Sequence, residues 1–134
     1  MFNTTFKDRI LKIAIEESKK STYPHKIGCV IFRKKTVISY DHNYECSHRN
    51  KLHPRFQRVP TTIHAEVATI IKAKTDLKHC EMLVVRVNKQ NKLLLAKPCN
   101  WCMEYIKYIG IKKVYYSINN FPYIEELSVR KIKI

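Results

Sequence analysis

The chain has 134 residues and a formal net charge of +15, from 26 Lys or Arg against 11 Asp or Glu, and 45% of its residues are hydrophobic. This length suits one globular domain, which we assign to residues 1–134. No apolar run reaches the ~18–20 residues of a membrane helix, and the first residues lack the apolar core of a signal peptide, so we expect a cytoplasmic protein that does not enter membranes.

The first third of the chain predicts a helix followed by a hairpin. Residues 4–20 carry apolar side chains with helical spacing, with Lys and Glu on the other face. The apolar positions are Phe6, Ile10, Ile13 and Ala14. The apolar runs 27–33 and 37–40 flank the basic pair Lys34-Lys35, which suits an antiparallel turn. Residues 42–60 show no periodicity, so we expect a long loop of the kind that often carries function.

The remaining elements alternate between helices and strands. We predict a helix that Thr61 or Thr62 caps and that runs to about Lys74, and a second helix over 99–109 that ends at Gly110. Strands are predicted at 82–87, 112–117 and 129–134. The order α-β-β-α-β-α-β-β predicts an α/β fold, a three-layer α/β/α sandwich around a five-stranded mixed sheet.

The connection before the last predicted strand bears on the direction of that strand. Only about ten residues, 118–128, separate the last two predicted strands. A parallel crossover needs about a dozen residues or more, usually with a helix. Pro122 and the pair Asn119-Asn120 favour a loop here. We therefore expect an antiparallel last strand, with a short helix over 123–127 as the alternative.

Two short motifs lie 35 residues apart, His64-Ala65-Glu66 and Pro98-Cys99-Asn100-Trp101-Cys102. Each opens a predicted helix, where exposed N–H groups and the helix dipole favour a cysteine thiolate. The C-x-x-C spacing is about one helical turn, so both sulfur atoms point the same way. The chain has five cysteines, an odd number that favours metal ligation over a framework of disulfides.

Three of these side chains, His64, Cys99 and Cys102, are ligands that zinc accepts. A catalytic zinc site has three protein ligands and a fourth position open to water. Glu66 is not needed as a ligand, so we predict that it accepts a proton from that water and delivers it to the substrate. The alternative is a structural zinc site with Glu66 as a helix-capping acid. A structural site needs a fourth ligand, and no further Cys or His lies close by in sequence.

With these motifs the chain resembles the cytidine deaminase superfamily, whose signature is H-x-E followed by P-C-x-x-C. The resemblance covers essentially the whole chain. It implies one catalytic Zn²⁺ held by His64, Cys99 and Cys102, with Glu66 as the proton shuttle. It also implies hydrolytic attack at C4 of cytosine, or at C6 of adenine, with release of ammonia. Oligomers are common in this superfamily, so we expect a homo-oligomer.

The residues around the motifs leave the substrate open. Ala68 stands where deoxycytidylate deaminases usually have Asn, and free cytidine deaminases typically have Cys in place of His64. Residues 103–106 lack the small side chains that bacterial-type tRNA adenosine deaminases have there. We predict conversion of cytosine to uracil in a nucleotide or nucleoside. The alternative is a nucleic-acid deaminase acting on cytosine in single-stranded DNA or RNA, or on adenosine in tRNA.

The basic charge and the long loop supply candidate substrate contacts. The charge suits attraction to nucleic acid or to a phosphorylated substrate, although a Lys-rich composition alone can produce it. The resemblance implies that Asn43 contacts the sugar, because many superfamily members have an Asn near this point; the alternative is that Asn43 closes its strand. Trp101 could wall the base pocket or pack in the core. Basic loop residues could contact phosphate or be solvated. The predicted substrate-binding set is Asn43, Ala65, Pro98, Trp101, Arg55 and Arg58.

A second zinc site in the long loop is a further hypothesis. Cys46, His48 and His53 offer three zinc donors there and could hold a structural ion, as in some nucleotide deaminases. We favour a single catalytic zinc, with Cys29 and Cys80 as small buried hydrophobic residues.

Overall fold

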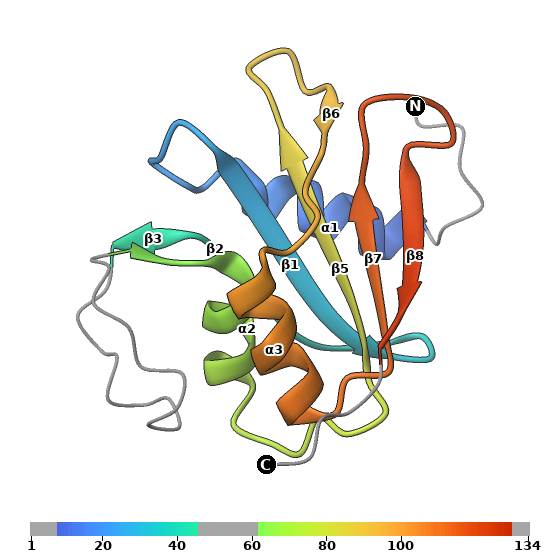
Figure 1. Ribbon diagram of the computed structural model, residues 1–134. Coiled ribbons are helices and arrows are strands. Elements are labelled where there is room, and N and C mark those ends of the chain that lie inside the picture. The colour runs from blue at the N-terminus through green and yellow to red at the C-terminus, as the bar shows by residue number, and fades with distance from the viewer. Residues whose placement is uncertain (1–7, 46–61, 130–134) are drawn as a thin grey trace.

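The computed structural model describes residues 8–45 and 62–129. In these two ranges the chain forms helices packed on one main sheet, with a small second sheet beside it (Figure 1). The elements in chain order are α1 (Asp8–Ser18), β1 (Lys26–Arg33), β2 (Thr36–His42), β3 (Tyr44–Glu45), β4 (Thr62–Ile63), α2 (Ala65–Ala73), β5 (Glu81–Val87), β6 (Leu93–Leu94), α3 (Asn100–Ile109), β7 (Lys113–Ser117) and β8 (Ile124–Ser128). None of the helices in the described ranges has the length and hydropathy needed to cross a bilayer.

The main sheet is mixed and has the strand order β2-β1-β5-β7-β8, with β6 paired to β5 in addition. β1 is antiparallel to both β2 and β5, which confirms the predicted hairpin. β5 and β7 are parallel, and α3 lies between them in sequence as the crossover. The prediction of five strands missed β6, a two-residue strand that the chain forms on its way to Pro98.

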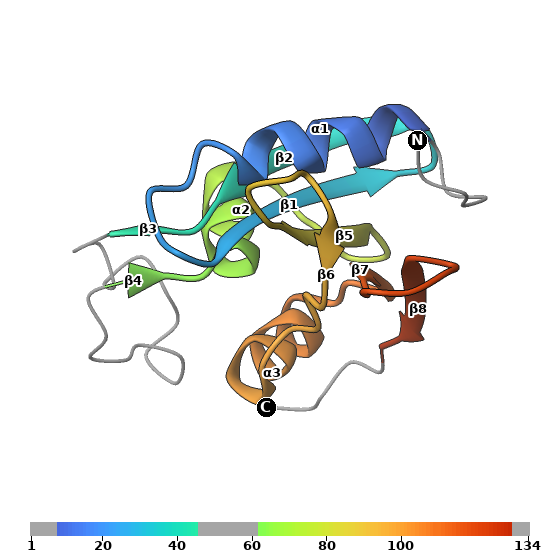
Figure 2. The ribbon, with the colours of Figure 1, turned by 90° about the horizontal axis from the view of Figure 1, so that it is seen from above.

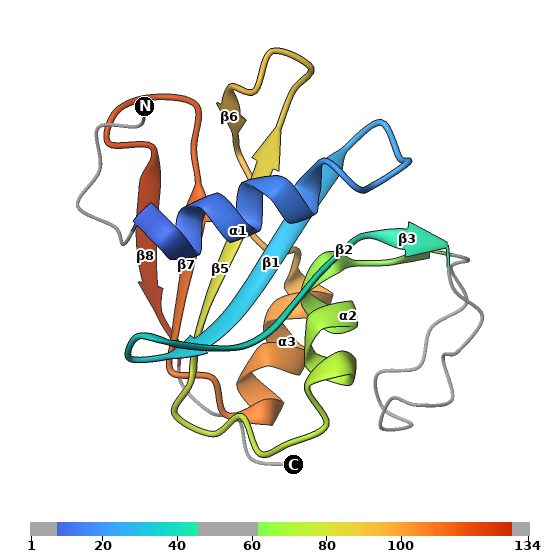
Figure 3. The ribbon, with the colours of Figure 1, turned by 180° about the vertical axis from the view of Figure 1, so that it is seen from behind.

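Helices cover both faces of this sheet, which confirms the predicted three-layer sandwich. α1 lies on one face and α2 and α3 lie on the other (Figures 1 and 3), and Figure 2 shows the sheet between α1 and α3. Because successive strand residues point to opposite faces, β1 contributes to two separate cores. Val30 and Phe32 pack with α1, whereas Cys29 and Ile31 pack with α2 and α3. Cys29 and Cys80 are both buried, as expected.

The helix α2 begins later than the sequence predicts. Thr62 lies in β4, which pairs with β3 across the two ends of segment 46–61, so the prediction that Thr61 or Thr62 caps this helix is wrong. Strand pairing holds the backbone extended up to His64, which is the N-cap instead. The prediction of a loop over 42–60 is wrong at its start, because His42 ends β2 and Tyr44–Glu45 form β3. Residues 46–61 lie outside the described ranges.

The last strand described also differs in position from the prediction. β8 occupies Ile124–Ser128, inside the segment predicted as a loop or a short helix, and residues 130–134 lie outside the described ranges. Its direction is the predicted one, because β8 is antiparallel to β7. The chain reverses in a tight turn in which Ile118 N–H donates to Tyr123 O at 2.8 Å. This short turn leaves enough residues for a strand where the sequence pattern indicated only a connection.

Gly28 allows α1 to approach β1 closely, and its replacement tests this packing. A Cβ atom at position 28 would clash with the backbone oxygen of Ala14 and come within 2.6 Å of the backbone nitrogen of Ser18. These are backbone atoms of α1, which cannot rotate away as a side chain could. We expect Gly28→Ala to lower the free energy of unfolding by about 1–3 kcal/mol or more, measured by urea denaturation.

The exposed residue Thr36, at the start of β2, provides the control. Thr36→Ala should change the free energy of unfolding by no more than about 0.5 kcal/mol. A Gly28→Ala protein as stable as the parent would show that α1 and β1 do not pack this closely.

Candidate active site

The two sequence motifs meet because α2 and α3 begin close to each other. His64 is the N-cap of α2 and Cys99 is the N-cap of α3, each with an extended backbone. Their carbonyl oxygens accept helical hydrogen bonds from Ala68 N–H at 3.0 Å and from Met103 N–H at 2.9 Å. Neither side chain caps its own helix. The imidazole and the thiol can therefore face each other while the backbone of each residue starts a helix.

His64, Cys99 and Cys102 form a compact group whose donor atoms all lie within 4.8 Å of one another. His64 Nδ1 is 3.1 Å from Cys102 Sγ and 3.7 Å from Cys99 Sγ. In a tetrahedral site with Zn–S near 2.3 Å and Zn–N near 2.0–2.1 Å, neighbouring donor atoms are roughly 3.5–3.8 Å apart. Among the described residues no fourth Cys, His or acidic side chain joins this group. The group therefore fits a zinc ion that keeps one position for a further ligand.

The two thiols of the group differ in acidity. Hydrogen bonds from the Cys102 side chain and backbone lower the pKa of Cys99 to about 5, with a further contribution from His64. The same contact between the sulfur atoms, together with burial, raises the pKa of Cys102. In the metal-free site, the contact between the two sulfur atoms therefore favours one thiolate and one thiol. A zinc ion binds thiolates, so loading this site with metal releases the proton of the thiol.

Glu66 lies in the first turn of α2, two residues after His64, and is only 4% exposed. Its carboxylate is not part of the three-residue donor group, yet it lines the same cleft. Burial raises the pKa of Glu66, although its own backbone N–H and His64 oppose part of that rise. A carboxyl group with a raised pKa is suited to both taking up and giving back a proton near neutral pH.

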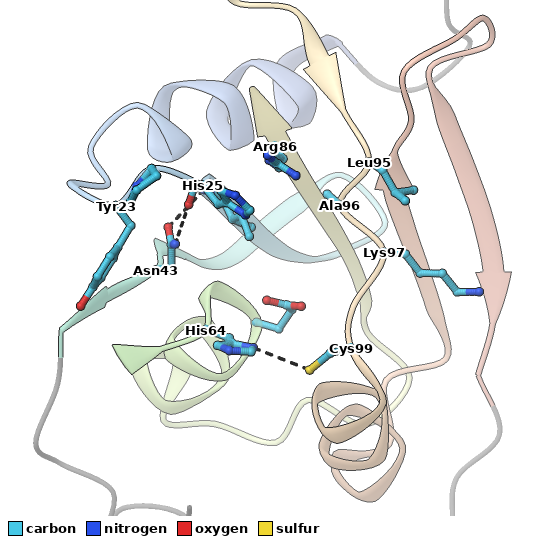
Figure 4. A pocket seen from close by; sticks show the side chains of 12 residues that line it. Tyr23, His25, Asn43, His64, Arg86, Leu95, Ala96, Lys97 and Cys99 are labelled. Carbon is cyan, nitrogen blue, oxygen red and sulfur yellow. Dashed lines mark hydrogen bonds between the residues drawn. The ribbon is translucent and has the colours of Figure 1, made fainter. Parts of the chain in front are cut away.

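A cleft of about 440 Å³ opens over these side chains (Figure 4). Its lining residues come from three groups of segments. The first is the segment before β1 with the start of β1 and the residue after β2, the second is the starts of α2 and α3, and the third is β5 with the segment that follows β6. The lining residues are Tyr23, Pro24, His25, Ile27, Asn43, His64, Glu66, Arg86, Leu95, Ala96, Lys97 and Cys99. A volume of this size is typical of sites for small-molecule ligands.

A family model decides what kind of site this is. The model described as "Cytidine and deoxycytidylate deaminase zinc-binding region" matches residues 4–118, a span that includes both motifs. The chain belongs to this deaminase family. The compact group of His64, Cys99 and Cys102 therefore lies within the family's zinc-binding region.

Solved structures of other deaminases share the fold. The apo dCMP deaminase of cyanophage S-TIM5 is 18% identical, with 87% of this chain and 89% of that chain covered and a TM-score of 0.55. The cytidine deaminase from Burkholderia pseudomallei is 14% identical, with 92% and 93% covered and a TM-score of 0.63. A structure from a study of A-to-I editing by tRNA:A34 deaminases is 18% identical, with 84% and 76% covered and a TM-score of 0.52. No curated protein matches the sequence.

Asn43, the predicted sugar contact, lines the cleft of this deaminase, but its amide also binds the backbone. Its Oδ1 accepts from Ile27 N–H at 3.1 Å, and its Nδ2 donates to His25 O at 2.7 Å. Figure 4 shows Asn43 beside His25 on the cleft wall. Asn43 therefore ties the residue after β2 to the segment that enters β1. This structural role is close to the alternative prediction, in which Asn43 closes the strand before it. A contact with the sugar stays a prediction.

The other residues predicted to contact the substrate either do not line the cleft or lie outside the described residues. Ala65 and Pro98 are buried and, like the half-buried Trp101, are not among the side chains that line the cleft. The Trp101 ring meets the His64 ring edge to face, with centroids 6.1 Å apart, so it supports the orientation of that imidazole. Contacts of these three residues with substrate stay predictions. Arg55, Arg58 and the hypothetical zinc ligands Cys46, His48 and His53 lie outside the described residues.

Sequence reasoning missed the two walls of the cleft and one basic residue between them. Residues 23–25 and 95–97 line the cleft, but they lie between predicted elements and carry no motif. Arg86 was included in an apolar strand without comment. A charged residue within an otherwise buried strand is a signal that could have pointed to the cleft.

Proposed function

We propose that this family member is a zinc-dependent hydrolytic deaminase that converts cytosine to uracil in a free nucleoside or nucleotide and releases ammonia. The observation that carries the proposal is a three-donor group, His64 with Cys99 and Cys102, next to a buried carboxylate that is not part of it. Both face one cleft of small-molecule size. Cytosine is favoured over adenine because the family description names cytidine and deoxycytidylate.

Each residue of the site has a defined task in this reaction. His64, Cys99 and Cys102 would hold one zinc ion, which supplies a Lewis acid that makes water acidic near neutral pH. Glu66 takes protons from the attacking water and delivers one to N3 of the base and one to the amino group at C4, which departs as ammonia. The C4–N bond of cytosine breaks, a C4–O bond forms, and no oxidant or reductant is consumed. The raised pKa of Glu66, caused by burial, suits this exchange of a proton in both directions.

A panel assay for released ammonia tests the proposed substrate class. The panel contains cytidine, deoxycytidine, their 5′-monophosphates, single-stranded DNA and tRNA, with uracil or hypoxanthine formation followed by chromatography. We expect deamination of the free cytosine compounds and none of adenine in tRNA. Activity on adenine alone would overturn the cytosine assignment.

The net charge of +15 is the observation that favours the alternative, a deaminase acting on nucleic acid. The dependence of substrate binding on salt concentration distinguishes a nucleic-acid substrate from a free nucleotide. A polymer bound through several Lys or Arg loses affinity steeply as salt rises, whereas a mononucleotide loses little. We expect the KM of the preferred free substrate to change only a few-fold between 50 and 200 mM salt. A protein that makes 6–10 contacts with the phosphates of a polymer would lose roughly 10³–10⁵-fold in affinity over the same range.

A further inference from the structure

Arg86 interrupts an apolar face of β5. Met82 and Val84 precede it on that face, are 0% and 1% exposed, and pack in the core that α2 and α3 share with the sheet. The alternation of the strand places Arg86 on the same face, but it is half-buried and lines the cleft. Figure 4 shows Arg86 across the cleft from His64 and Cys99. A cationic side chain in this setting is costly unless it meets water or an anion.

The described part of the chain offers no acidic partner to the guanidinium of Arg86. The hydrogen bond of Arg86 within these ranges is made by its backbone N–H, which donates to Ser117 Oγ at 3.1 Å. Ser117 Oγ in turn donates to Leu94 O at 2.6 Å, so this end of β5 is tied to both β7 and β6. Glu66 is the acidic residue among those that line the cleft, and it lies two residues after His64 in the first turn of α2. Arg86 is therefore held on a strand of the main sheet, where its side chain lines the cleft.

The other basic side chains of the cleft are placed differently. Lys97 and His25 are both exposed. Figure 4 shows Lys97 extending away from Arg86 and His64, toward the outside of the cleft. Arg86 is thus the permanent cation that faces the interior of the cleft among the residues described. A guanidinium presents a planar fork of N–H donors that matches the oxygen atoms of a phosphate in two-point contact.

We propose that Arg86 is a specificity-determining residue that binds the 5′-phosphate of a cytosine nucleoside monophosphate, with the base at the His64 and Cys99 end of the cleft. This proposal rests on the proposed function and narrows its substrate class from nucleosides and nucleotides to monophosphates. The arrangement places the anionic and the reacting ends of one small molecule at opposite ends of one cleft.

A terminal phosphate fits this position better than the backbone of a nucleic acid. Arg86 lies within the sheet, paired with Ile27 of β1 on one side and Leu94 of β6 on the other. A polymer bound there would have to enter and leave the cleft on either side of the contacted phosphate. A monophosphate ends at that point. The test must therefore also be able to detect activity on a nucleic acid.

The test compares Arg86→Gln and Arg86→Lys with the control Arg9→Gln, which removes the same charge from the exposed start of α1. We measure kcat/KM for dCMP and for deoxycytidine, and binding of the products dUMP and deoxyuridine by calorimetry. Because hydrogen bonds to charged groups contribute substantially, Arg86→Gln should lower kcat/KM for dCMP and affinity for dUMP by about 10–100-fold. Values for deoxycytidine and deoxyuridine should stay within about 2–3-fold, and Arg86→Lys should fall between parent and Arg86→Gln.

The outcomes separate this proposal from the proposed function. Equal losses for dCMP and deoxycytidine, or no loss in either variant, would overturn the role of Arg86 while leaving the deaminase activity in place. Equal binding of dUMP and deoxyuridine by the parent protein, or activity on single-stranded DNA alone, would overturn it as well. If the parent binds dUMP through Arg86 but releases no ammonia from any substrate, the phosphate site stands and the proposed function fails. Arg86→Lys keeps the test decisive if Arg86→Gln does not fold.

Discussion

Glu66→Gln should lower kcat for deamination by about 10²–10⁴-fold, the range that general acid–base catalysis contributes, without loss of zinc or of the fold. The amide has nearly the shape of the carboxyl group but cannot take up a proton and return it. Burial raises the pKa of Glu66, which means that folding penalises its charged form. The neutral amide should therefore leave the free energy of unfolding at neutral pH equal or higher. Activity is measured by ammonia release, zinc by elemental analysis and stability by urea denaturation.

Glu104→Gln is the matched control, because Glu104 is an exposed residue of α3 outside the cleft. It should leave kcat within about two-fold of the parent, as expected for a surface residue without a role in the reaction. A Glu66→Gln enzyme with the activity of the parent would contradict the assignment of the proton shuttle. A loss of zinc together with activity would instead place Glu66 in the metal site.

Cys102→Ala should remove both zinc and activity. Cys102 is fully buried, and its sulfur is 3.1 Å from His64 Nδ1, so its loss leaves two ligands and a cavity in place of the third. We expect zinc affinity to fall by more than the roughly 10–100-fold typical of residues that only support metal ligands. In the parent, a chelator should abolish activity and added Zn²⁺ should restore it, whereas Zn²⁺ should not restore the variant. Elemental analysis should give about one zinc per parent chain.

Cys29→Ala controls for the loss of a buried thiol. Cys29 is as fully buried as Cys102 and packs in the same core, but it is not part of the donor group. This variant should be less stable than the parent yet keep its zinc and its dependence on the metal. Retention of one zinc per chain by Cys102→Ala would show that the metal is held elsewhere.

The metal site was predictable because its parts are local. Cys99 and Cys102 stand about one helical turn apart, so their spacing predicts that the sulfur atoms point the same way, whereas His64 and Glu66 stand two residues apart and need not share a face. The structure brings the three predicted ligands within 4.8 Å and keeps Glu66 outside their group. The layers of the fold were predictable for a similar reason, because helical and strand periodicities differ along the chain.

Tertiary contacts decided what short-range patterns could not. The pairing of β3 with β4 set the start of α2 at Ala65, and pairing with β7 turned Ile124–Ser128 into a strand although its pattern resembles a connection. The cleft walls also come from segments far apart in sequence. Asn43, His25 and Arg86 meet only because β1 lies between β2 and β5 in the sheet.

The sequence by itself therefore determined the family and the candidate zinc donors of this protein, and the tertiary structure decided what surrounds them. The residue types and spacings of His64, Cys99, Cys102 and Glu66 predict a zinc-dependent deaminase, and the family model shows that the chain belongs to a zinc-binding deaminase family. The proposed role of Arg86 depends on the register of β5 against β1 and on its place in the cleft wall, with no acidic partner among the described residues. Register and partner arise from the packing of distant segments, so only the folded chain could place a cation opposite the metal site.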